Sequence, residues 1–110
     1  MKVPGAERAF VDPAKVRDYL LSPAHPVGRF KAQVFLSLGY TQLRWDVLVG
    51  DLLQHVCDGL AEETAETRYG RKFRVRGMLA GPNGRRALFA SIWLLRHDAE
   101  GPRLLTAFPD

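Results

Sequence analysis

The chain is poor in the residues that bind metals or cross-link a fold. Cys57 is the only cysteine among 110 residues, so the chain forms no intramolecular disulfide and no cysteine-based metal cluster. The histidines show neither the HExxH pattern nor another metal-ligand spacing. A glycine-rich phosphate loop and a serine nucleophile motif are also missing. These absences argue against the motif-defined metalloenzymes, P-loop proteins and serine hydrolases, and we expect no cofactor.

Long apolar runs are missing too. No window approaches the roughly 18 uninterrupted apolar residues that a membrane span requires. Pro4 and Glu7 interrupt the N-terminal segment where a signal peptide needs an apolar stretch. We therefore expect a cytoplasmic protein that does not contact a membrane. With 46% hydrophobic residues, the chain is expected to bury a core and to fold as one domain over residues 1–110.

The first half of the sequence predicts three helices. Residues 12–22 begin with Asp12 as an N-cap and Pro13 at the first helical position. A second helix is expected over residues 26–38, before Gly39. A third follows Thr41, an N-cap candidate, and runs to Gly59. The apolar stripe expected on the second helix consists of Phe30, Val34 and Leu38.

From Ala61 onward the apolar period changes to two, which is typical of strands. The segment GPNGR (81–85) predicts a hairpin turn, because proline presets the first corner and Asn-Gly tolerates positive φ. Residues 86–95 are apolar on both faces and predict a central strand. The expected strands cover residues 62–68, 67–80, 86–95 and 103–108. The order predicts an α+β fold with three N-terminal helices packed on one face of an antiparallel sheet of about four strands.

The formal net charge is +4, and part of the excess is concentrated in one stretch. Residues 68–96 hold eight basic residues and no acidic one, and their alternation places Lys72, Arg74 and Arg76 on one strand face. Two interpretations are open: a solvated strand face, or a cationic platform for a nucleic-acid backbone. A purely solvating surface usually mixes both signs of charge, which favours the platform. The eight are Arg68, Arg71, Lys72, Arg74, Arg76, Arg85, Arg86 and Arg96.

The segment HPVGRFKA (25–32) gathers His25, Arg29 and Lys31 at the start of the second helix. Solvent exposure is a sufficient explanation for these charges. The alternative is an anion site, made by exposed first-turn amides together with the two basic side chains. Gly28 has no rationale in helix propensity, and a glycine there would let a partner or another part of the chain approach the backbone.

These motifs resemble a bacterial family, domain of unknown function 6883. The resemblance rests on PGAERAFVDPAKVRDYLLSPAHPVGRFKAQVFLSLGY, YGRKFRVRGMLAGPNGR, IWLL and PRLLTAFP, and it covers nearly the whole chain. HPxGRxKA, GPNGR and TA-aromatic-P are its most specific signatures. This family resemblance implies no particular activity.

The order of elements also looks like the barnase–EndoU–colicin–RelE superfamily of metal-independent ribonucleases, many of which are bacterial toxins neutralised by a small partner protein. The resemblance implies an RNA substrate, a small cognate antitoxin or other acidic protein partner, and catalysis by side chains alone. It assigns His25 as acid/base, Lys31 and Arg76 as phosphate ligands, and Thr106 as a hydrogen-bond donor. Additional RNA or anion contacts are expected from Arg29, Lys72, Arg74 and Arg85. These ribonucleases often carry a histidine or tyrosine near the last strand, where this chain has Phe108, which cannot move a proton.

A second function remains open at this stage. The chain could be a non-enzymatic interaction module whose basic sheet face docks an acidic partner protein. A stable domain with a lost activity is a third interpretation. The ribonuclease hypothesis requires His25, Lys31, Arg76 and Thr106 to meet in one cleft.

Overall fold

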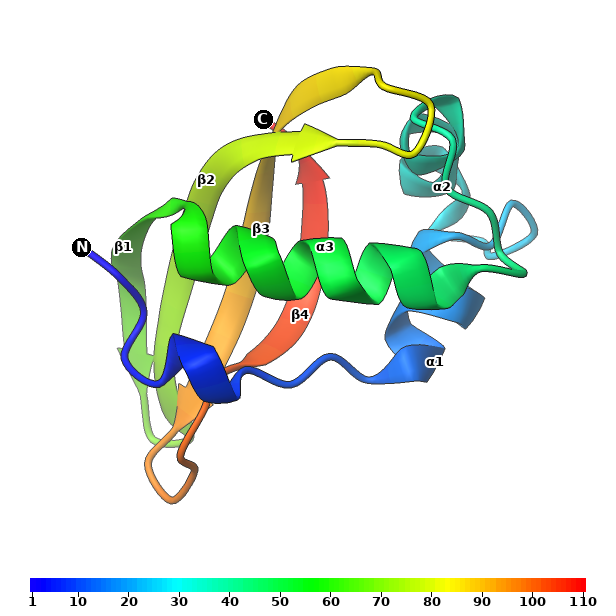
Figure 1. The fold of residues 1–110 in the computed structure, drawn as a ribbon. Helices are drawn as coiled ribbons and strands as arrows, with labels where there is room; N and C mark the ends of the chain where they lie inside the picture. The colour runs from blue at the N-terminus through cyan, green and yellow to red at the C-terminus, as the bar shows by residue number, and fades with distance from the viewer.

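The computed structural model describes residues 1–110 and has the α+β architecture expected from the sequence: three helices followed by a four-stranded antiparallel sheet (Figure 1). The helices are α1 (Pro13–Lys15), α2 (Arg29–Ser37) and α3 (Trp45–Asp58). The strands are β1 (Leu60–Thr67), β2 (Gly70–Ala80), β3 (Arg86–Arg96) and β4 (Arg103–Pro109), in the spatial order β1-β2-β3-β4. None of the helices has both the length and the apolar character that a membrane crossing needs.

The N-terminal segment is more irregular than the sequence pattern suggests. A short 3₁₀ helix, η1 (Ala6–Arg8), precedes α1, and α1 continues directly into a π-helical turn, η2 (Val16–Leu20). Asp12 caps α1 as predicted, because its Oδ1 accepts a hydrogen bond from the amide of Ala14 at 3.0 Å. The predicted helix over residues 12–22 is therefore present as two joined helical turns.

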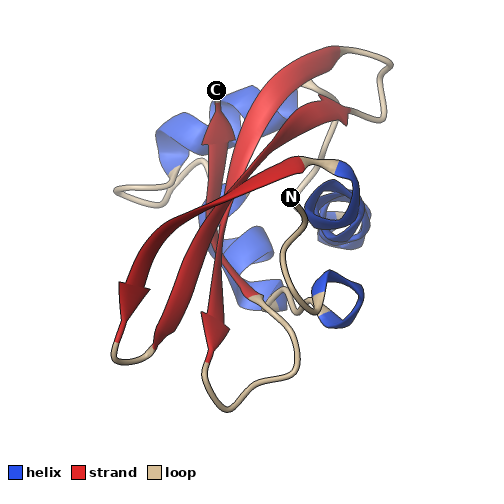
Figure 2. Cartoon of the chain, turned by 90° about the vertical axis from the view of Figure 1, so that its left-hand side faces the viewer, coloured by secondary structure: helices blue, strands red, loops and turns tan.

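Helix α3 lies across one face of the sheet, which we call the inner face (Figures 1 and 2). Leu48, Leu52 and Val56 recur at intervals of four and are all buried, so they form the stripe that packs on the sheet. From the sheet side, alternate residues of β2 and β3 point toward this helix and are buried: Phe73, Val75, Leu79, Phe89, Ser91 and Trp93.

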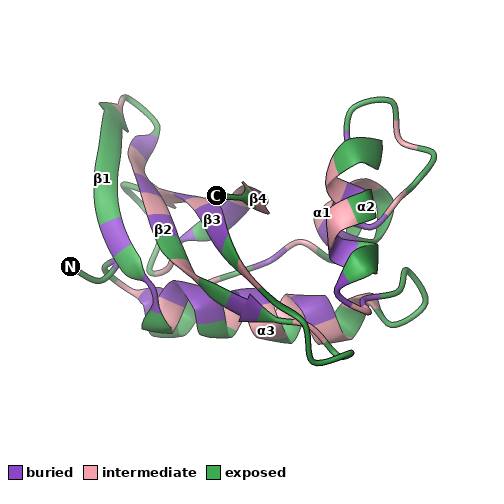
Figure 3. Cartoon of the chain, turned by 90° about the horizontal axis from the view of Figure 1, so that it is seen from above, coloured by how far each residue is buried: buried purple, intermediate pink, exposed green.

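Helices α1 and α2 lie beyond β4, at the opposite end of the sheet from β1 (Figure 3). Phe35 of α2 is fully buried and stacks on Phe89 of β3, with ring centroids 5.0 Å apart. The expected apolar stripe was wrong in one member: Phe30 is 63% exposed. The contact of Phe35 with the sheet sets the rotation of α2, and it turns Phe30 toward solvent.

A buried polar network links α3 to the inner face. His55 donates from Nε2 to the carbonyl oxygen of Gly77 at 3.1 Å, and its Nδ1 accepts from the Ser91 hydroxyl at 2.9 Å. Trp93 Nε1 donates to the same hydroxyl oxygen at 2.7 Å. Because every polar atom of this buried group has a partner, the network fixes the position of α3 on the sheet.

Protonation of His55 is expected to weaken the fold at acidic pH. Burial lowers the pKa of His55, although the carbonyl of Gly77 acts in the opposite direction. The backbone of Phe89 also opposes the shift, and Asp51 and Asp58 line a pocket beside the ring, but burial dominates. The unfolded chain therefore takes up the proton first as the pH falls, so this stabilisation is present above about pH 6.5 and is lost below it.

Urea unfolding of the wild type at pH 7 and pH 5 tests this effect. We expect a lower free energy of unfolding at pH 5, and a smaller pH dependence in His55→Gln. His97→Gln is the matched control, because His97 is exposed near the β3–β4 turn. An unchanged pH dependence in His55→Gln would show that another group is responsible.

Candidate functional site

Lys31 is the centre of a polar cluster at the β4 edge of the sheet. Its ammonium group donates to the hydroxyl oxygen of Tyr19 at 2.8 Å and to that of Thr106 at 2.9 Å. The three residues come from η2, α2 and β4, and Lys31 and Thr106 are 75 positions apart. All three are half-buried, so the cluster packs against the protein and is still reached by solvent. We call Tyr19, His25, Lys31 and Thr106 the Lys31 cluster.

The Tyr19 hydroxyl is electrostatically unusual. The hydrogen bond from the Lys31 ammonium lowers the pKa of Tyr19, and partial burial opposes this shift. The positive charge of Lys31, the Thr106 hydroxyl and the charge of Lys15 lower it further. The tyrosine therefore loses its proton more readily than an ordinary phenol, which suits a general base.

His25 joins the cluster through the tyrosine ring. The His25 ring meets the Tyr19 ring edge-on at a centroid distance of 4.9 Å. Its Nδ1 accepts hydrogen bonds from the amides of Val27 at 3.0 Å and Gly28 at 2.9 Å. The neutral ring must therefore carry its proton on Nε2, so His25 is held as a hydrogen-bond donor. The same contacts occupy two of the amides that the sequence suggested for an anion site.

Gly28 explains how η2 and α2 come together. A Cβ at this position would overlap with the carbonyl oxygen of Tyr19 and lie 3.1 Å from the tyrosine ring. The glycine therefore permits the close approach of another part of the chain, which is one of the roles proposed for it from the sequence. This approach brings Tyr19 within reach of Lys31.

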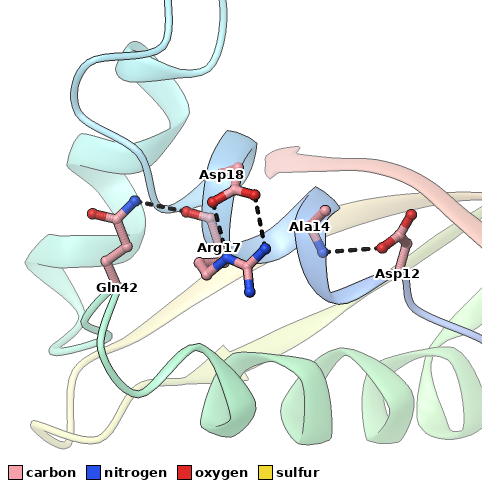
Figure 4. A network of polar contacts seen from close by, with 5 residues as sticks. All are labelled: Asp12, Ala14, Arg17, Asp18 and Gln42. Carbon is pink, nitrogen blue, oxygen red and sulfur yellow. Dashed lines mark hydrogen bonds and ion pairs between the residues drawn. The ribbon is translucent and has the colours of Figure 1, made fainter.

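A hydrogen bond between η2 and the loop before α3 also helps to fix the position of η2, which carries Tyr19 (Figure 4). Gln42 donates from Nε2 to the carbonyl oxygen of Arg17 at 2.8 Å, and Arg17 pairs with Asp18 at 2.9 Å. Tyr19 follows directly in the chain. A pocket of about 400 Å³ lies on this side of the cluster and is lined by Asp12, Ala14, Lys15, Asp18, Tyr19 and His25.

Lys72, Arg74 and Arg76 of β2 lie on the sheet face opposite α3, which we call the outer face. Residues paired directly across neighbouring strands point to the same face. Arg74, Ile92 and Thr106 are paired in this way and form one row across β2, β3 and β4. Arg76, Ala90 and Phe108 form the next row. Lys72 shares this face and pairs with Leu94. The outer face thus carries basic residues on β2 and leads across β3 to the Lys31 cluster.

The structure brings together three of the four proposed catalytic residues. His25, Lys31 and Thr106 meet around Tyr19, whereas Arg76 lies two strands away from β4 and pairs through Nε with Asp110 at 2.9 Å. Sequence reasoning did not select Tyr19, because a tyrosine spaced with Val16 and Leu20 on one helix face is typical of a core residue. Its hydroxyl group was the available signal, since a tyrosine at the edge of a core usually directs its oxygen to a polar partner.

The residues proposed for RNA or anion binding are dispersed. Arg29 is exposed and stacks on the ring of Phe30 at 4.8 Å, next to the Lys31 cluster in sequence. Arg85 lies in the β2–β3 turn, where its Nη1 donates to the carbonyl oxygen of Ser37 at 3.5 Å. Lys72 and Arg74 lie on the outer face of β2.

The absence of acidic residues in the stretch 68–96 does not make the sheet acid-free. Glu63 of β1 pairs with Arg71 at 2.6 Å, and Glu62 lies 3.7 Å from Arg74. The stretch 68–96 begins after the end of β1, and antiparallel pairing brings these glutamates next to the arginines. The charge argument for a purely basic platform was therefore wrong in part, because β1 neutralises one edge of it.

Comparisons with known proteins identify a solved structure with a similar fold and a family model that matches the sequence. No curated protein is similar enough to register as a match. Among solved structures, a chain of a contact-dependent growth inhibition toxin–immunity protein complex from Klebsiella pneumoniae 342 has a TM-score of 0.70 at 19% sequence identity, covering 91% of this chain and 98% of that chain. At this level of identity the likeness shows a common fold. The model of the family described as Domain of unknown function (DUF6883) matches residues 2–110, and the chain therefore belongs to that family.

Proposed function

We propose that residues 1–110 act as one domain, a ribonuclease-like toxin that cleaves RNA in the cytoplasm with its own side chains and is neutralised by a small cognate protein. The observation that carries this proposal is the contact of Lys31 Nζ with both Tyr19 and Thr106, which joins three distant segments into one polar cluster. The similarity to a chain of a toxin–immunity complex supports the toxin role and the protein partner.

The Tyr19–Lys31 pair has the chemistry needed for cleavage of a phosphodiester. The Tyr19 phenolate takes the proton of the ribose 2′-hydroxyl, and the 2′-oxygen forms a bond to phosphorus. The bond from phosphorus to the 5′-oxygen breaks, and Lys31 gives a proton to that oxygen. The products are a 2′,3′-cyclic phosphate and a 5′-hydroxyl end. A proton then passes from Tyr19 to Lys31 along their 2.8 Å hydrogen bond and restores the pair.

Thr106 and His25 suit the stabilisation of the transition state. The phosphorane carries additional negative charge on its non-bridging oxygens, and preorganised donors stabilise such charge. The Thr106 hydroxyl lies beside the Lys31 ammonium, and the His25 Nε2–H is available because Nδ1 is occupied by backbone amides. We assign His25 the role of donor and of support for the Tyr19 ring.

The outer face suits the approach of a single-stranded substrate. Ile92 and Leu94 are half-buried there, between the basic side chains of β2 and the residues of β4. Basic side chains bind the phosphate backbone, and the aliphatic surface that they flank offers apolar contacts to sugars and bases. Under this proposal Lys72, Arg74 and Arg76 bind the RNA chain, and Arg29 and Arg85 contribute charge at the sides.

Incubation of the purified protein with total RNA in EDTA tests the proposal. We expect cleavage by the wild type, products with 5′-hydroxyl ends, and a loss of about 10²–10⁴-fold in rate for Lys31→Ala. His25→Ala should cause a smaller loss because its group only donates hydrogen bonds. Lys2→Ala is the matched control, since Lys2 contacts the carbonyl oxygens of Asp58 and Gly59 and lies outside the Lys31 cluster.

Expression in a bacterial host tests the toxin role separately. Growth arrest that depends on Lys31 supports a toxin, and rescue by a co-expressed small protein supports a cognate partner. An inhibitor-free wild-type protein that cleaves no RNA would contradict the enzyme proposal. Partner capture that survives Lys31→Ala and is lost on reversal of Arg74 and Arg76 to glutamate would instead favour the non-enzymatic module.

A further inference from the structure

The row Arg74, Ile92 and Thr106 crosses the outer face and ends at the Lys31 cluster. A small pocket lies at the Arg74 end of this row. It has a volume of about 240 Å³ and lies where β1 meets β2. Two arginines, Arg74 and Arg76, contribute its charged wall, and Glu62 contributes a single carboxylate. Its remaining lining residues are Leu60 and Ala61.

The Arg74 guanidinium is poorly satisfied within the protein. Its Nε is buried and has no hydrogen-bond partner, which is rare for a buried side-chain nitrogen. The contact of its Nη1 with Glu62 is 3.7 Å long, beyond the range of a hydrogen bond. Arg76 adds a second guanidinium, whose Nε lies 2.9 Å from an Asp110 carboxylate oxygen. Because an arginine carries five N–H donors, both side chains retain capacity for an anionic acceptor.

The position of this pocket relates it to the Lys31 cluster. Arg74 pairs with Ile92 and Ile92 with Thr106, so Arg74 and Thr106 are separated by two strand spacings, about 10 Å. A nucleic-acid chain that has one phosphate at Lys31 and Thr106 can place another phosphate at Arg74 by crossing β3. The half-buried Ile92 side chain between them offers an apolar contact for the intervening sugar or base.

We propose that Arg74 and Arg76 form a second phosphate-binding site, which holds a phosphate of the RNA chain next to the one that is cleaved. This proposal rests on the proposed function and adds a length requirement to it. The substrate must extend beyond a dinucleotide, because a dinucleotide has one phosphate and fills only the Lys31 cluster. Arginine suits this task because its planar fork binds phosphate oxygens in pairs.

Binding of RNA that the protein cannot cleave tests the second site without relying on catalysis. The probes are 2′-O-methyl oligonucleotides of two and six nucleotides, measured by fluorescence anisotropy or by competition. We expect the hexamer to bind more tightly than the dinucleotide. Arg74→Gln should weaken hexamer binding about tenfold and leave dinucleotide binding unchanged. The same variant should reduce the salt dependence of hexamer binding by about 0.7 in the log–log slope, as expected for one lost phosphate contact.

Two further variants supply an effect of the opposite sign and a neutral control. Glu62→Gln removes the carboxylate from the pocket and should tighten hexamer binding. Arg44→Gln is the matched charge control: Arg44 pairs with Asp46 at the start of α3, on the inner side of the sheet, and should change neither affinity. A hexamer with a single methylphosphonate next to the central linkage should lose affinity for the wild type and lose little further for Arg74→Gln.

The outcomes separate the second site from the proposed function. Equal effects of Arg74→Gln on both lengths, or no effect on either, overturn the second site, while cleavage of total RNA still decides the proposed function. Binding of neither probe by the wild type also overturns the second site. Loss of affinity limited to the hexamer, with the reduced salt slope, supports it.

Discussion

Tyr19→Phe is expected to lower the rate of RNA cleavage by about 10²–10⁴-fold, the range typical of a lost general base. The substitution removes one oxygen atom and keeps the ring, so the edge-on contact with His25 and the packing of η2 are retained. The Lys31 ammonium loses one acceptor and keeps its contact with Thr106 at 2.9 Å. The fold should therefore persist while the base is lost.

A rate profile over pH identifies the base more directly. Since the Lys31 ammonium lowers the pKa of Tyr19, the rate should rise with pH through a midpoint below 10, the ordinary value for tyrosine. Lys31→Met removes the main cause of this shift, so any residual activity should rise at higher pH than in the wild type. Quenched-flow or gel assays with a defined RNA give both profiles.

Tyr69→Phe is the matched control for the loss of a phenol oxygen. Tyr69 is exposed in the β1–β2 turn, where its oxygen accepts from Arg68 at 2.8 Å. It should cleave RNA like the wild type. Full activity in Tyr19→Phe, with thermal unfolding unchanged, would exclude the phenolate as base and leave Lys31 as the first residue to reconsider.

The sequence predicted the sheet well because its signals are local. Alternation over residues 67–80 and the turn GPNGR specify a hairpin without reference to the rest of the chain, and Gly84 has the positive φ of 86° that the turn residues suggested. The apolar character of residues 86–95 also correctly indicated the central strand, because β3 is paired on both sides.

The Lys31 cluster was harder to predict from local sequence signals. His25, Lys31 and Thr106 were selected as candidates by resemblance, and the sequence had no local signal for their convergence. The Tyr19–Lys31 contact depends on the approach of η2 to Gly28, which is a tertiary event. The pairing of Glu62 with Arg74 was missed for a related reason, since strand register brings together residues that a linear window separates.

Phe35→Ala is expected to destabilise the protein by about 3–5 kcal/mol, the range for a buried phenylalanine that leaves a cavity. The ring is fully buried, stacks on Phe89 and meets Tyr40 edge-on at 6.3 Å. It joins α2 to the sheet, and Lys31 lies one helical turn before it on the same helix. Because domains of this kind are stable by only about 5–15 kcal/mol, the loss removes much of the total and loosens the Lys31 cluster.

Phe30→Ala is the matched control, because it is the same substitution on the same helix. Phe30 is 63% exposed, so its free energy of unfolding should change by no more than about 0.5 kcal/mol. Chemical unfolding followed by the fluorescence of the two tryptophans, of which Trp93 is fully buried, measures both variants. If the two variants were equally destabilised, the rotation of α2 described above would be wrong. Phe30 would then face the core together with Val34 and Leu38, as expected from the sequence, and the contact of Lys31 with Thr106 would have to be re-examined.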